Sequence, residues 1–78
     1  MERFPERLVD LLDRTGNTRR SLAHSLGMSE RMVQYYLTGA KDPAAHTLIA
    51  IADFFDCSID YLVGRSDDPT YRRPPGSA

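Results

Sequence analysis

Side chains that can bind nucleic-acid bases and phosphates are concentrated between residues 18 and 41 of the 78-residue chain. Arginine can grip guanine O6 and N7, glutamine can pair with adenine, and glutamate can accept a hydrogen bond from the cytosine amino group. Phosphates are held by basic side chains, by hydroxyl groups and by the first turns of helices. Eight residues are candidates for contacts of these two kinds: Thr18, Arg19, Glu30, Arg31, Gln34, Tyr35, Thr38 and Lys41.

Two short helices separated by a tight turn are expected to position these residues. Thr18 is a good N-cap and apolar residues follow it at helical spacing, so the first helix is predicted at about 19–26. Gly27 supplies the positive φ that turns the chain, and Ser29 caps a second helix at about 30–38. A helix pair of this length can place its second helix in the major groove of DNA.

The second helix of the pair has one apolar side and one polar side. Placing Val33 at the centre of the buried side turns Arg31, Gln34, Tyr35 and Thr38 outward. Arg31 is the best candidate for a direct contact with guanine, and Gln34 for one with adenine. Tyr35 can pack on a thymine methyl group or bond a phosphate.

The remaining candidates lie at the ends of the two helices. Glu30, in the exposed first turn, can accept from a cytosine amine or can repel the DNA backbone and reject sites. Thr18 and Arg19 at the start of the first helix, and Thr38 and Lys41 after the second, are expected to hold phosphates.

Three further helices are predicted around this pair. The first runs from about 5 to 15, with Arg7 among the charged residues on its outer side. Another is predicted at about 44–55, and a short one begins after Ser58 and ends at Gly64. In the short helix Leu62 and Ile59 are expected to point inward.

These elements form one all-α, five-helix domain, expected to span residues 1–66. Residues 67–78 contain three prolines and little to bury, so they are expected to form a flexible tail or linker.

Charge is distributed unevenly although the net charge is only −1. Residues 14–41 carry five bases and one acid, whereas residues 42–68 carry six acids and one base. The helix pair is therefore the positive end of a polarised domain, and a local basic face can steer DNA.

No residue pattern indicates catalysis, a cofactor or a metal. His24, His46 and Cys57 lack metal-ligand spacing, and no nucleophile has a base and a third group beside it in a recognisable motif. Cys57 is expected to pack in the core. One cysteine and the lack of a signal-peptide or membrane-span pattern favour a cytoplasmic protein.

A family resemblance covers about residues 7–67. The residues that carry it are Ala23, Gly27, Val33, Gly39, Pro43 and the run from 51 to 65. With these residues the chain resembles the Cro/C1-type (XRE-family) helix-turn-helix domains of bacterial and phage repressors. The resemblance implies a lambda-repressor-like fold that binds double-stranded DNA at a palindromic operator as a homodimer, at least when on DNA.

The chain departs from the pattern of this family at a few positions. Arg19 stands where the family usually has a glutamine that contacts phosphate and base, and Asn17 stands where an apolar residue is usual. Leu12 and Leu37 occupy positions where family members often have a partly buried arginine–glutamate pair. Two well-packed apolar side chains can replace such a pair without loss of stability, so Leu12 and Leu37 are expected to touch.

The resulting hypothesis is a sequence-specific transcriptional regulator, expected to be a repressor. Its dimer surface is expected near the short last helix, with Phe54, Tyr61 and Val63 exposed. The alternative is an antitoxin-like or other protein-interaction module with secondary DNA binding, favoured by the acidic residues of 42–68. A protein partner or anti-repressor is compatible with either hypothesis.

Overall fold

The structure, a computed structural model, describes residues 2–70 of the chain and confirms the all-α prediction. Its helices are α1 (Phe4–Thr15), α2 (Arg19–Leu26), α3 (Glu30–Thr38), α4 (Ala45–Phe55) and α5 (Ile59–Val63). Within the described range the only β structure is an isolated antiparallel bridge between Cys57 and Thr70. The predicted helices therefore all exist, and their ends lie within about one residue of the expected ones.

The hydroxyl residues predicted as caps begin the helices of the central pair. The Thr18 side chain accepts a hydrogen bond from the Ser21 backbone N–H, and the Ser21 hydroxyl accepts one from the Thr18 N–H. The Ser29 hydroxyl accepts from the Met32 N–H at the start of α3. Between the helices, Gly27 has a φ of +66°, which a glycine adopts without steric cost. The cap bonds fix where α2 and α3 begin, and the turn at Gly27 fixes where α2 ends.

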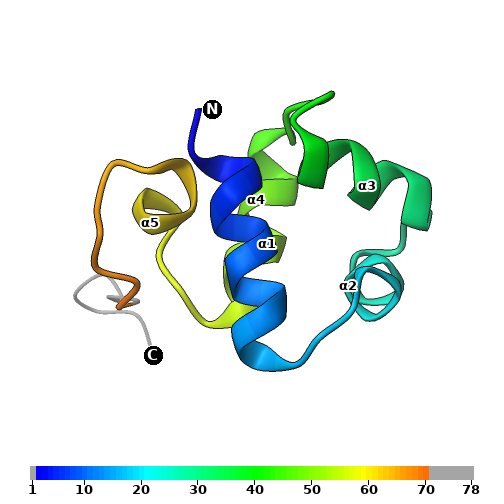
Figure 1. The fold of residues 1–78 in the computed structure, drawn as a ribbon, viewed down its shortest axis with the longest axis horizontal. Coiled ribbons are helices and arrows are strands. Elements are labelled where there is room, and N and C mark those ends of the chain that lie inside the picture. The colour runs from blue at the N-terminus through cyan, green and yellow to red at the C-terminus, as the bar shows by residue number, and fades with distance from the viewer. Residues whose placement is uncertain (1, 71–78) are drawn as a thin grey trace.

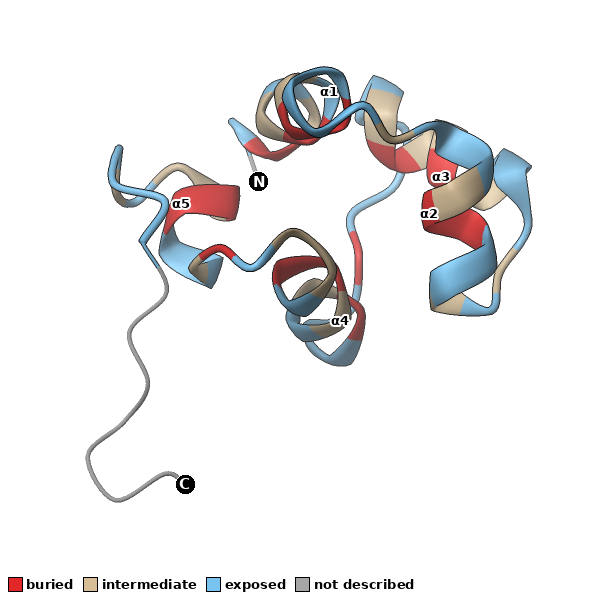
Figure 2. Cartoon of the chain, turned by 90° about the horizontal axis from the view of Figure 1, so that it is seen from below, coloured by how far each residue is buried: buried red, intermediate tan, exposed pale blue. Residues whose placement is uncertain are grey.

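The helices enclose one apolar core. Figure 2 shows the buried residues on the inner faces of the helices. The largest fully buried side chains are Phe4, Leu8, Leu22, Val33, Ile51 and Leu62. Phe4, which precedes the helix predicted from residue 5, packs edge-on against Tyr36 with ring centroids 6.2 Å apart. This aromatic pair links the start of α1 to the back of α3.

The two leucines predicted to replace an ion pair both belong to this core region. Leu12 is buried, and Leu37 is half-buried and packs against the same cluster. The helices that carry them, α1 and α3, pack on each other. A direct contact between the two side chains remains a prediction.

Three predictions about side-chain orientation are wrong. Ile59, expected to point inward, is 39% exposed, whereas Tyr61, expected at an exposed dimer surface, is only 6% exposed. Arg7, expected on the outer side of α1, has a side chain that is only 11% exposed. The reason is common to Arg7 and Tyr61, because the guanidinium lies 4.1 Å from the centroid of the Tyr61 ring. Each residue covers the other at the contact between α1 and α5.

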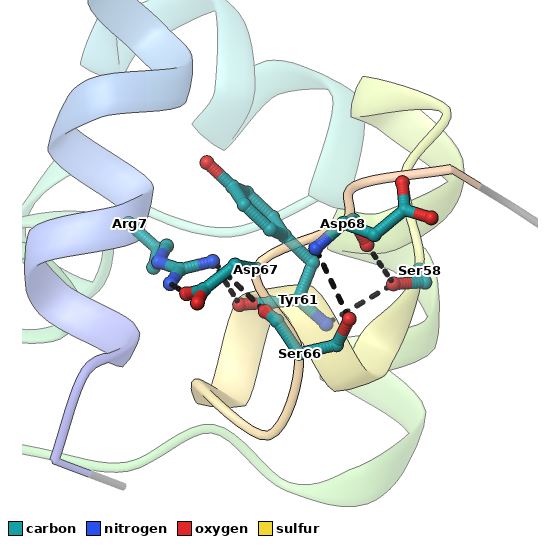
Figure 3. A network of polar contacts seen from close by, with 6 residues as sticks. All are labelled: Arg7, Ser58, Tyr61, Ser66, Asp67 and Asp68. Atoms are coloured by element: carbon teal, nitrogen blue, oxygen red, sulfur yellow. Dashed lines mark hydrogen bonds and ion pairs between the residues drawn. The ribbon is translucent and has the colours of Figure 1, made fainter.

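Residues 67–70, expected to begin the tail, are attached to the domain. Arg7 donates to the backbone carbonyls of Tyr61 and Ser66 and forms an ion pair with Asp67 at 2.7 Å, as Figure 3 shows. The Ser58 N–H donates to the Pro69 carbonyl, next to the bridge at Thr70. The rest of the predicted tail, 71–78, lies outside the described residues.

The helix pair α2–α3 and the segment 65–70 lie at opposite ends of the molecule (Figure 1). α1 runs between them and packs on α3 and on α5, while α4 packs on α2 and α5. The elongated arrangement measures 37 Å along its longest axis and 24 Å along the other two. The candidate residues of α2 and α3 are therefore presented at one end, supported from behind by α1 and α4.

Candidate nucleic-acid interface

The two sides of α3 differ as its sequence predicts. Val33 and Tyr36 are buried, which confirms that they form the side facing the core. On the other side Glu30 and Arg31 are exposed, while Gln34 is half-buried. The polar groups of α3 thus lie away from the core and are held there by the packing of its back.

Five of the eight candidate residues come together in one hollow. It has a volume of about 550 Å³ and is lined by Arg19, Glu30, Arg31, Gln34 and Tyr35. Arg19 comes from the first turn of α2, and the other four come from the first two turns of α3. The structure therefore places together all four α3 residues to which a base contact was assigned.

Arg19 is bonded to its neighbours on α3. Its Nη1 donates to the Gln34 Oε1 over 2.5 Å, and its Nε lies 3.7 Å from the Glu30 Oε1. The Arg19 and Glu30 side chains are each about half exposed, so this ion pair is of the weak, solvent-screened kind. The sequence analysis assigned Arg19, Glu30 and Gln34 to DNA contacts and missed that Arg19 contacts the other two. Periodicity within a helix carries no information about the angle at which α2 crosses α3.

Arg31 differs from Arg19 in having no partner among the described residues. Within residues 2–70 its guanidinium makes no hydrogen bond and no ion pair, although it lines the same hollow. Its five N–H donors are therefore available to a ligand.

The other three candidates lie outside the hollow. Thr18 uses its oxygen as the α2 cap, which leaves its hydroxyl hydrogen available as a donor. Thr38 is exposed, and its hydroxyl lies 3.3 Å from the Tyr35 carbonyl oxygen. The Lys41 ammonium lies 5.0 Å from the centroid of the Tyr35 ring and so forms a cation–π contact. Lys41 thereby covers the Tyr35 ring while its charge remains at the surface.

No group of three or more histidine, cysteine, aspartate or glutamate side chains within residues 2–70 is placed to hold a metal ion. Cys57 is buried, as expected, and burial, together with the nearby charge of Asp56, raises the pKa of its thiol to about 11. No helix in the described part of the chain is long and apolar enough to cross a membrane.

Comparison with known proteins gives the same picture as the geometry. The family model for helix-turn-helix domains matches residues 8–62. The chain is 31% identical over 66 residues to the "uncharacterized HTH-type transcriptional regulator YobD" of Bacillus subtilis, a match that covers 85% of this chain and 59% of that protein.

A solved structure is also similar. A transcriptional regulator from Listeria innocua matches with a TM-score of 0.74 and 31% identity, over 95% of this chain and 64% of that one. The chain thus spans less than two thirds of the length of either relative. Because the helix-turn-helix family model covers more than half of the chain, and the fold and the α2–α3 geometry agree with it, the chain belongs to the Cro/C1-type (XRE) helix-turn-helix family of DNA-binding domains.

Proposed function

We propose that the protein is a sequence-specific repressor that reads the major groove of DNA with α3 and acts as a two-fold dimer. The observation that carries the proposal is the hollow at the α2–α3 end, where polar side chains with distinct donor and acceptor patterns line one surface. A helix whose back is buried and whose front carries such groups fits the dimensions of the major groove.

Arg31 is assigned to guanine, because its donors have no partner within residues 2–70 and its planar fork matches guanine O6 and N7. Tyr35 lines the same hollow and is assigned to a thymine methyl group. Thr18, Thr38 and Lys41 flank the hollow and are assigned to phosphates, which would fix the register of α3 in the groove.

The flank of α5 is the surface through which we expect the two protomers of the dimer to contact each other. Tyr61 is unsuitable as a contact because it is buried, but Ile59 at 39% exposure and the half-buried Val63 and Phe54 remain on this part of the surface. Two-fold symmetry would place the two α3 helices in successive major grooves, about 34 Å apart, and would require a palindromic site.

A protein partner is the second candidate, and one observation favours it. Ile49 on α4 is 50% exposed, and Ile59 on α5 is also exposed, in the half of the chain where acids outnumber bases. Exposed apolar side chains of this size are suited to a protein contact. They serve equally well in a dimer, so DNA binding decides between the two functions.

Selection of bound sequences from a pool of random double-stranded DNA tests the proposal. We expect enrichment of one palindromic sequence, with half-site centres one helical turn apart and guanine in each half-site. The affinity for the enriched sequence should fall steeply as salt is raised, because phosphate contacts release counterions. Absence of any enriched sequence, together with tight retention of a protein partner, would favour the interaction module instead.

A further inference from the structure

The hydrogen bond from Arg19 to Gln34 restricts what Gln34 can offer to DNA. A free glutamine amide can turn over and exchange its oxygen for its NH₂ group. Here Oε1 accepts from the Arg19 Nη1 over 2.5 Å. In the reversed orientation two sets of donors would face each other, so the guanidinium selects the orientation with the oxygen toward α2. The NH₂ group is then the part of the amide left to bind an acceptor on a base.

The same guanidinium acts on Glu30 as well. Glu30 and Gln34 are separated by one turn of α3, so their side chains are neighbours on one face of the helix. The Arg19 Nε lies 3.7 Å from the Glu30 carboxylate, which offsets a negative charge that would otherwise face the DNA phosphates. One planar cation from α2 therefore contacts two reading residues of α3.

Resting on the proposed function, we propose that Arg19 is a positioning residue for base readout. Its guanidinium holds the Gln34 amide by a hydrogen bond, lies beside the Glu30 carboxylate, and so fixes which group of the amide α3 presents to the bases. Specificity at the base pair read by Gln34 then depends on Arg19 although Arg19 does not touch that base pair. This differs from the phosphate contact expected for Arg19 from the sequence alone.

The substitution Arg19→Lys tests the positioning role, because lysine keeps the charge but cannot reach both partners with a planar fork. Arg20→Lys is the matched control, since Arg20 is adjacent, exposed and without a partner within residues 2–70. Affinities are measured for the selected DNA site and for all its single-base variants. The base pair read by Gln34 is the one at which Gln34→Ala weakens preference most.

We expect Arg19→Lys to reduce the preference at that base pair by about tenfold, the size of one good side-chain–base contact. The affinity for scrambled DNA and its salt dependence should stay unchanged, and Arg20→Lys should alter neither property. In the Gln34→Ala background Arg19→Lys should have no further effect on preference at this base pair, which separates positioning from a direct contact.

Two results would overturn the positioning role while leaving the proposed function intact. An unchanged preference profile would show that Gln34 is oriented without Arg19. An equal loss of affinity for every sequence would show that Arg19 contributes to affinity and not to base readout. A wild-type protein without sequence preference would instead overturn the proposed function and the positioning role together. Thermal unfolding of each variant shows whether the fold is retained.

Discussion

At the scale of single residues, two arginines on the same surface have different surroundings. Arg19 and Arg31 line the same hollow, but Arg19 is bonded to Gln34 and Glu30 while Arg31 has no partner within residues 2–70. The outward direction of Arg31 follows from helical periodicity and could be predicted. The bonds of Arg19 could not, because they depend on how two helices cross.

Cys57 gives a prediction about the pH dependence of stability. Burial, with a smaller contribution from Asp56, raises its pKa from 9.0 to about 11 in the folded protein. Above pH 9 the unfolded chain therefore loses the thiol proton first, and stability falls as the pH rises. At pH 11 this thiol should lower the unfolding free energy by roughly 2–3 kcal/mol relative to pH values below 9.

Chemical denaturation of the wild type and of Cys57→Ala, each followed from pH 8 to pH 11, measures this contribution. The variant starts less stable because it leaves a small cavity, but its stability should fall less over this pH range. Effects of pH that do not involve Cys57 are shared by the two proteins and cancel in the comparison. Parallel pH curves for the two proteins would contradict the raised pKa.

At the scale of elements, most of the fold could be predicted because its determinants are local. The N-caps Thr18, Ser29 and Ser58 and the turn at Gly27 each act within three or four residues, and the structure confirms all of them. The exposed Ile59 and the buried Tyr61 were not foreseen, since a helix as short as α5 offers too few residues to define a face.

Arg7 contributes to the attachment of residues 65–70, and its contacts join residues about 60 positions apart. Composition alone suggested a tail, since proline and aspartate are common in linkers. What composition cannot show is that the guanidinium of α1 reaches the carbonyls of Tyr61 and Ser66. The domain is therefore continued up to Thr70 by backbone contacts.

Substitutions at the two ends of this contact should differ in their cost. Arg7→Met retains the aliphatic length but removes the bonds to two carbonyls and the contact with Tyr61, so we expect a loss of about 1–3 kcal/mol in unfolding free energy. Asp67→Asn removes only the ion pair of a carboxylate that is 95% exposed, and we expect less than about 1 kcal/mol. Urea denaturation measures both. An equal loss in the two variants would show that the ion pair, rather than the carbonyl bonds, holds the segment.

At the scale of the whole molecule, the basic and the acidic stretches of the sequence belong to different groups of helices. The basic residues of 14–41 accompany α2 and α3 at one end, and the acidic residues of 42–68 accompany α4, α5 and the segment after α5. Under the proposed function, such a molecule would approach DNA with the α2–α3 end first, because the field of a basic patch acts before contact. The acidic end would face away from the DNA and remain available for a second copy or another protein.

The central claim is that the front of α3 reads bases, and Arg31 tests it most directly. Affinities of the wild type, Arg31→Ala and the control Arg20→Ala are measured for the selected site and each single-base variant. We expect Arg31→Ala to lose preference at one guanine of each half-site, at a cost of about 1–3 kcal/mol per half-site, and Arg20→Ala to retain every preference. Arg31→Ala with an unchanged preference at every position would contradict the claim.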